Sequence, residues 1–79
     1  HGVLTEILNT ATHQLISYSG RSLIIENMMI YFLQAVQLDD YLTLQSRLVR
    51  ETRRSAIIDY EIYLEHQLVA KATITVKIN

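Results

Sequence analysis

The chain contains no cysteine and no proline, and only two of its 79 residues are glycine. Without cysteine it forms neither a disulfide nor a thiolate metal site, and this composition fits a reducing compartment, so we expect a cytoplasmic protein. Because proline and glycine are the residues that most often interrupt regular structure, their scarcity leaves few forced breaks. Long helices or strands are therefore expected over most of the chain.

The chain also lacks a surplus of positive charge and a long apolar run. Its net charge is −1, which offers nothing to neutralise the phosphates of a nucleic acid. A membrane span needs roughly 18 apolar residues, and Glu26 and Asn27 interrupt the longest candidate. We expect neither nucleic acid nor membrane as a partner.

What the chain does have is apolar surface, since 49% of its residues are hydrophobic. A domain of this length buries only about 60% of the surface that its unfolded chain exposes. With no disulfide or metal to add stability, a second chain is the remaining source, so we expect a homodimer or a dimer of dimers. We interpret residues 1–79 as a single domain. Because the chain opens directly on a helical pattern without Met, we expect it to be a fragment or the ordered part of a longer chain.

The order of hydrophobic patterns is one helix followed by strands. A stripe at three- and four-residue spacing predicts an amphipathic helix from Val3 to Tyr18, and Ser19-Gly20 would end it. Period-two alternation predicts strands over residues 21–33, 41–53, 56–64 and 69–78. The fold class is therefore α+β, with the helix packed on a curved antiparallel meander. The helix stripe consists of Leu4, Ile7, Leu8, Ala11, Leu15 and Tyr18.

Two strands have special features. The strand over residues 21–33 is apolar on both faces, which predicts that one face meets the helix and the other a partner subunit. In the last strand, Ala70 and Ala72 lie on the inward face, where small residues predict a helix crossing closely overhead. The expected faces of the first strand are Leu23, Ile25, Met29, Tyr31 and Leu33 on one side, and Ile24, Met28, Ile30 and Phe32 on the other.

Short motifs along the chain resemble the hotdog fold of the thioesterase superfamily. They are His1-Gly2-Val3-Leu4 and Ile7-Leu8-Asn9-Thr10-Ala11 in the helix, the turn Val36-Gln37-Leu38-Asp39-Asp40, the turn Arg53-Arg54-Ser55, and Leu68-Val69-Ala70-Lys71-Ala72-Thr73 in the last strand. The chain looks most like the C-terminal hotdog modules of bacterial regulatory proteins with CBS domains upstream. It is also similar to the acyl-CoA-sensing domain of a Gram-positive lipid-synthesis repressor.

The resemblance implies a central helix on a curved sheet and a coenzyme A thioester as ligand. It also implies a strand before the helix, which is absent from this sequence. Val3 stands where the family's helix-opening motif has its second glycine. Its side chain would leave less space for a ligand carbonyl to approach the helix N-terminus. Asn9 stands where the family has its catalytic Asp or Glu.

Thioester chemistry needs a carboxylate base and donors for the oxyanion. Free N–H groups at the helix N-terminus make Gly2 and Val3 candidates for the thioester oxygen, the alternative being an ordinary helix start. Asn9 cannot act as a base, so Glu6, three residues earlier, is a candidate substitute. The alternative is that Glu6 is a favourable charge in the first helical turn. His13 is a weaker catalytic candidate, and the three histidines lack metal-ligand spacing, so no metal is expected.

The basic turn is the candidate cofactor-binding site. Guanidinium groups of Arg53 and Arg54 beside the Ser55 hydroxyl suit the phosphates of coenzyme A, the alternative being a solvated turn. Met28 and Met29 would line an acyl pocket or simply pack in the core.

We therefore interpret the chain as an acyl-CoA or acyl-thioester binding domain, a ligand-sensing module with its site at a dimer interface. Two alternatives remain open. One is an acyl-CoA thioesterase with Glu6 as its base. The other is a dimerisation module that binds no ligand.

Overall fold

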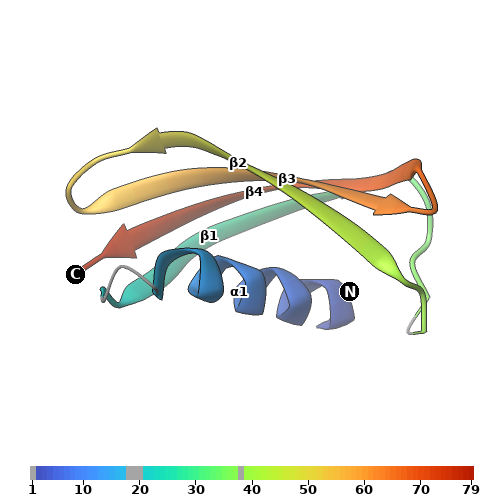
Figure 1. Cartoon of the computed structure of the whole chain (residues 1–79), viewed down its shortest axis with the longest axis horizontal. Coiled ribbons are helices and arrows are strands. Elements are labelled where there is room, and N and C mark those ends of the chain that lie inside the picture. The colour runs from blue at the N-terminus through green and yellow to red at the C-terminus, as the bar shows by residue number, and fades with distance from the viewer. Residues whose placement is uncertain (1, 18–20, 38) are drawn as a thin grey trace.

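One helix lies along the concave side of a curved four-stranded sheet (Figure 1). The structure is a computed structural model that describes residues 2–17, 21–37 and 39–79. The predicted α+β class is confirmed, whereas His1, Tyr18 and the predicted stop at Ser19-Gly20 lie outside the described residues. The elements are α1 (Gly2–Ser17), β1 (Leu23–Phe32), β2 (Leu42–Glu51), β3 (Ser55–Leu64) and β4 (Gln67–Ile78).

The strands are antiparallel and lie in the order β1-β4-β3-β2. The predicted meander is therefore correct for β2, β3 and β4 but wrong for β1, which pairs with β4 instead of β2. The chain leaves β1 along β4, where the amides of Leu33 and Gln34 both donate to the Val69 carbonyl, at 2.8 and 3.3 Å. Hydrophobic alternation specifies which face a strand buries but not which strand it neighbours. Strands β1 and β2 are the two edges of the sheet.

Strand β1 contains a β-bulge that changes its faces partway along. Its pairing with β4 shifts register between Ile25 and Asn27. Because a bulge adds one residue, it reverses the alternation that follows. The predicted faces are therefore wrong after the bulge: Met28 packs against the core, whereas Met29 and Tyr31 are exposed outside. This placement gives Met28 the core-packing role.

Strands β3 and β4 form the centre of the core as their alternation predicts, except that Val69, expected on the outer face, is buried beside Ala70 where the register shifts. Their inward side chains are buried between the sheet and the helix, which contributes Leu4 and Leu8. Complete burial of one such aliphatic side chain stabilises the fold by about 1.5–3 kcal/mol. The buried residues of these two strands are Ala56, Ile58, Tyr60, Ile62, Val69, Ala70, Ala72, Ile74, Val76 and Ile78.

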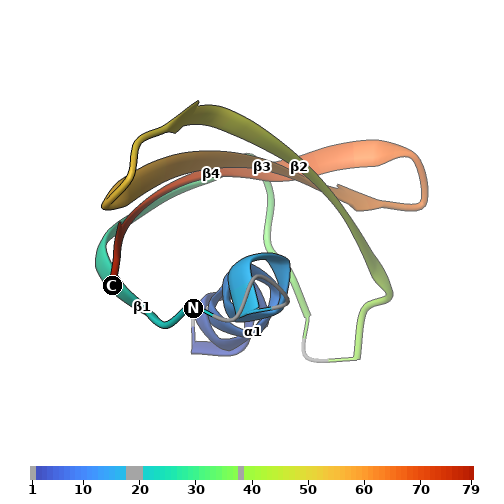
Figure 2. The ribbon, with the colours of Figure 1, turned by 60° about the vertical axis from the view of Figure 1, so that its left-hand side comes forward.

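The small residues of β4 make room for a side chain and not for the helix backbone. Helix α1 approaches β1 more closely than β4, so the predicted close crossing over Ala70 and Ala72 is wrong. Ala72 instead pairs in register with Tyr60, whose hydroxyl lies 2.9 Å from the Thr12 hydroxyl on α1. The sheet curves around the helix, as the turned view shows (Figure 2). A tyrosine thus bridges the space between the layers.

Candidate functional site

The N-terminal end of α1 presents open space. Helix α1 begins at Gly2, and a Cβ atom placed on this residue would meet nothing within 4 Å. The first amides of a helix have no partner within the helix, so this end offers N–H donors to a ligand oxygen. Val3, the next candidate, is half-buried and lines a groove beside the helix.

That groove runs between α1 and β2 and has a volume of about 510 Å³. Glu6 is one of its lining residues, together with Ile7 and Leu44. The first turn of α1 contains no acidic residue, so the interpretation of Glu6 as a first-turn charge is wrong. The helix begins at Gly2, which places Glu6 in the second turn. The full lining is Val3, Glu6, Ile7, Thr10, Ala11, Gln14 and Leu44.

Asn9 lies on a different flank of the helix. It follows Glu6 by three positions, and this spacing places the two side chains about 60° apart around the helix axis. Asn9 is exposed, and its backbone carbonyl lies 2.8 Å from Nδ1 of His13. The structure therefore does not bring Asn9 and Glu6 to one point. His13 is exposed and contacts its own helix backbone.

The turn between β2 and β3 is held together by hydroxyl groups. The hydroxyls of Thr52 and Ser55 lie 2.8 Å apart, and the Thr52 amide donates to the Ser55 carbonyl at 2.8 Å. The amides of Arg54 and Ser55 donate to Thr52 Oγ1, at 3.3 and 3.1 Å. Ser55, predicted to contact phosphate, thus has its hydroxyl engaged within the turn. Thr52, which organises these bonds, was not identified from the sequence.

The two arginines of this turn use their backbones for structure and leave their side chains free. The Arg53 carbonyl accepts a hydrogen bond from the Arg21 guanidinium, and the Arg54 carbonyl accepts one from the Ile78 amide at 2.7 Å. Both arginines are exposed, and within the described ranges neither guanidinium forms an ion pair or hydrogen bond. Such groups suit a bound anion.

The two parts of the predicted site lie at opposite ends of the domain. Figure 1 shows the N-terminus of α1 at one end, and the β2–β3 turn beyond the other end of the helix. Helix α1 has 16 residues. At about 1.5 Å per residue its axis is about 24 Å long. One chain therefore does not gather Gly2 and Arg53 at a single point.

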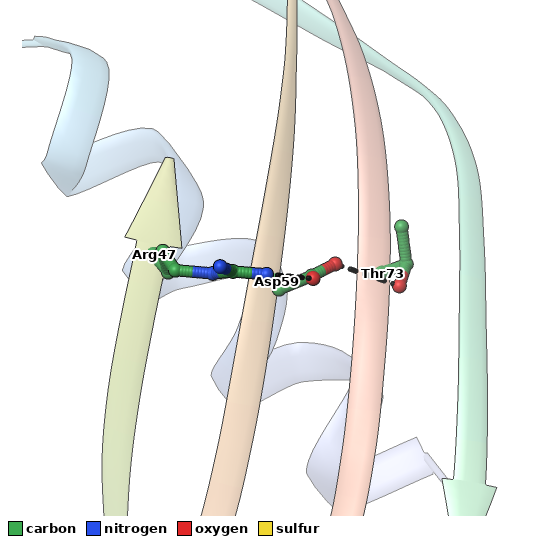
Figure 3. A network of polar contacts seen from close by, with 3 residues as sticks. All are labelled: Arg47, Asp59 and Thr73. Carbon is green, nitrogen blue, oxygen red and sulfur yellow. Dashed lines mark hydrogen bonds and ion pairs between the residues drawn. The ribbon is translucent and has the colours of Figure 1, made fainter. Parts of the chain in front are cut away.

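The outer face of the sheet carries a separate polar network (Figure 3). Asp59 accepts a hydrogen bond from Thr73 at 2.9 Å and pairs with Arg47 at 3.4 Å. Nearby, Tyr63 donates to Glu61 at 3.0 Å, and this bond raises the pKa of the tyrosine. Asp59 thus links three neighbouring strands, whereas the Tyr63–Glu61 bond lies within β3, and such pairs are usual for the solvated face of an antiparallel sheet.

In residues 2–17, 21–37 and 39–79, no three His, Cys, Asp or Glu side chains are placed to hold a metal ion. Over the same ranges, no helix is long and apolar enough to cross a membrane.

A family model and a curated relative both match nearly the whole chain. The family model described as Thioesterase superfamily matches residues 1–71. The curated Bacillus subtilis protein YtoI is 28% identical in an alignment of 79 residues that covers 99% of this chain and 18% of YtoI.

Two solved structures share the fold. The crystal structure of a hypothetical thioesterase protein with coenzyme A from Streptococcus pneumoniae has a TM-score of 0.85 and 25% identity, over 99% of this chain and 64% of that one. A Bacillus halodurans protein crystallised with CoA has a TM-score of 0.81 at 20% identity, over 100% of this chain and 55% of that one, a likeness of fold alone.

The chain thus spans less than two thirds of each of these relatives. Its helix on a curved antiparallel sheet is nevertheless their hotdog architecture, and the family match extends over nearly its whole length. The chain belongs to the thioesterase superfamily.

Proposed function

We propose that this chain is an acyl-CoA binding domain that senses its ligand at the interface of a homodimer. The observation that carries the proposal is the similarity, over 99% of the chain, to a Streptococcus pneumoniae protein crystallised with coenzyme A. The guanidinium groups of Arg53 and Arg54 support it, because they are exposed, form no ion pair with any described residue, and suit phosphate.

Binding without rapid turnover is favoured by the residues of α1. Asn9 occupies the position that resembles the family's acid, and a carboxamide cannot take a proton from water. Glu6 lies on another flank of the helix and lines the groove facing Leu44. A site that holds a thioester but lacks a placed base is suited to sensing.

The dimer is proposed from the exposed edge of β1. This strand has no neighbour on one side within the described part of the chain. Unpaired, apolar edge strands are prone to pair with another chain. Several of the large hydrophobic side chains that stay exposed belong to this strand and the residue that follows it: Ile24, Met29, Tyr31, Phe32 and Leu33. The proposed occupant is β1 of a second copy, paired antiparallel.

Such pairing would complete a site that one chain leaves divided. In such a dimer the two chains are related by a two-fold axis that passes beside β1, perpendicular to the sheet. This axis turns the partner end for end along the long axis of the domain. The partner's helix N-terminus then lies at the same end as Arg53 and Arg54 of this chain. Each dimer would contain two composite sites, with thioester donors from one chain and phosphate ligands from the other.

Binding is tested by titrating the chain with CoA and a series of acyl-CoAs while following its unfolding temperature. A ligand at 100 times its dissociation constant adds about 2.7 kcal/mol to the stability of the folded state. A dimer whose stability no acyl-CoA changes would favour the alternative of a ligand-free dimerisation module. Brisk hydrolysis that Glu6→Gln abolishes would favour the thioesterase alternative.

The composite site is tested with mixed dimers. One chain carries Arg53→Ala and Arg54→Ala, and the other carries Val3→Pro, which removes one amide donor in the first turn, where proline is tolerated. In a composite arrangement the mixed dimer has one intact site and one doubly altered site. If each site belonged to one chain, both sites of the mixed dimer would be altered and neither would bind at wild-type affinity.

A further inference from the structure

Arg21 connects the start of β1 to the β2–β3 turn. One Nη atom of its guanidinium donates a hydrogen bond to the Arg53 carbonyl. The Asn79 amide donates to the carbonyl of the neighbouring Ser22 at 3.0 Å, and the Ile78 amide donates to the Arg54 carbonyl at 2.7 Å. Three segments far apart in the sequence thus meet at one end of the sheet, and they bring three arginines together.

Within the described residues, the three arginines at this end form no ion pair, although Glu51, with its carboxylate, ends β2 just before the turn. A guanidinium has five N–H donors, and the described contact of Arg21 uses one Nη atom. Lys77 pairs in register with Ser55 and adds a fourth positive charge nearby. Because like charges repel, a bound anion would stabilise this arrangement.

We infer that Arg21 is a third phosphate-binding residue of the β2–β3 turn. Its contact with the Arg53 carbonyl fixes the turn from the β1 side, and its remaining donors face the same ligand as Arg53 and Arg54. The ligand class is a phosphoryl group, as a monoester or as a diphosphate. The inference rests on the proposed function only for the identity of the molecule that carries this phosphate. Under that function the phosphate belongs to the nucleotide half of coenzyme A.

The test compares Arg21→Gln with wild type by calorimetric titration of CoA, dephospho-CoA, pantetheine and inorganic pyrophosphate. Glutamine removes the charge, and because its amide ends two bonds short of the Nη atom that reaches the Arg53 carbonyl, it also loses that contact, whose separate effect the phosphate-free pantetheine reports. The control is Lys71→Gln, which removes one positive charge from an exposed residue of β4 whose register partner is Glu61. Arg21→Gln should weaken CoA binding about tenfold or more, because hydrogen bonds to charged groups are the strong ones. The control should stay within about twofold of wild type, since solvent screens a distant exposed charge.

Dephospho-CoA locates the contact. If the effect of Arg21→Gln disappears with this ligand, Arg21 contacts the 3′-phosphate, and if the effect persists, it contacts the diphosphate. If Arg21→Gln weakens the binding of CoA and of pantetheine, which has no phosphate, by the same factor, Arg21 acts only by holding the turn in place. That result would overturn the inference. Unchanged CoA affinity in Arg21→Gln would also overturn it while leaving the proposed function intact.

A wild-type protein that binds pyrophosphate but not CoA, with a dependence on Arg21, would reject the proposed function and retain the inference. Binding of neither ligand would reject both.

Discussion

Thr12 and Tyr60 share a buried hydrogen bond between α1 and β3, with their hydroxyl oxygens 2.9 Å apart. Thr12 is completely buried and Tyr60 nearly so. The bond satisfies the Thr12 hydroxyl where water does not reach, and it fixes the position of the helix over the sheet. A buried hydroxyl that loses its partner pays its full desolvation cost.

Removing one hydroxyl of this pair should destabilise the fold. Tyr60→Phe is expected to lower the free energy of unfolding by about 1–3 kcal/mol, because it leaves Thr12 unsatisfied. The double variant Thr12→Val with Tyr60→Phe should cost less than the sum of the single variants. Urea denaturation measures all three. Tyr41→Phe is the control, since Tyr41 is 93% exposed, and additive costs for Thr12 and Tyr60 would contradict the coupling.

The same pair predicts a loss of stability at high pH. Burial raises the pKa of Tyr60 above its ordinary value of 10.0, an effect larger than the opposing influence of the Thr12 hydrogen bond. The folded state therefore holds the phenolic proton more tightly than the unfolded state. The contribution of Tyr60 to the free energy of unfolding is fully present below about pH 10 and is lost as the pH rises through the raised pKa.

Unfolding curves measured from pH 8 to pH 11 test this prediction. Tyr60→Phe should show a smaller decline at alkaline pH than wild type. Tyr63→Phe is a useful comparison, because the hydrogen bond to Glu61 raises the pKa of Tyr63 as well. An unchanged alkaline decline in Tyr60→Phe would contradict the assignment to Tyr60.

Charges on β1 should dissociate the proposed dimer. Met29→Lys with Tyr31→Lys adds two charges per chain beside the expected two-fold axis, and desolvating them would weaken association by more than about tenfold. Light scattering across a concentration series measures the change. The control is Val49→Lys with Tyr41→Lys at the opposite edge, since Val49 and Met29 are both 48% exposed. Equal effects of the two pairs, or a wild-type monomer at micromolar concentration, would reject pairing through β1.

Replacing both turn arginines should weaken coenzyme A binding without unfolding the domain. Arg53→Ala with Arg54→Ala is expected to cost about 2–4 kcal/mol, from two charge-assisted contacts with some overlap. Ser55→Ala should instead reduce stability by about 0.5–1.5 kcal/mol, because its hydroxyl bonds Thr52 within the turn. Titration and thermal unfolding separate the two outcomes. An unchanged isotherm in the arginine variant would make this a solvated turn.

Acyl-CoA hydrolysis by the wild type should be absent or very slow. Asn9→Asp keeps the side-chain shape and supplies a proton acceptor, so a gain of about 10²–10⁴-fold is expected. A thiol-detection assay with several acyl-CoAs measures it. Thr10→Asp, an exposed neighbour on the helix, is the control for a general effect of added negative charge. Equal rates in the two variants would remove Asn9 from the site.

The sequence predicted the elements better than their arrangement. The inward faces of β3 and β4 followed from alternation up to the register shift between Ile62 and Tyr63, where Val69 and Ala70 are both buried. After Glu26 the faces of β1 were wrong: the bulge coincides with the polar pair Glu26-Asn27, but the apolar residues that follow fit either register. Pairing of β1 with β4 is likewise invisible to a local pattern.

The candidate site was predictable only in pieces. Gly2 and Arg53 were identified by resemblance, but their separation depends on which end of the sheet each element reaches. Thr12 was missed because a hydroxyl on a helix normally counts as polar surface. Arg21 was missed because only the fold brings it to Arg53.

The pairing of β1 with β4 also determines how this chain can fold. Leu23 pairs with Ile78 and Phe32 with Ala70, whereas β2, β3 and β4 each pair with the strand next to them in sequence. Pairings between distant segments form slowly, because a long loop must close before they gain any contact. During that interval the most apolar strand of the chain has no neighbour, which exposes it to aggregation. The rate at which β1 pairs with β4 should therefore limit the yield of folded protein.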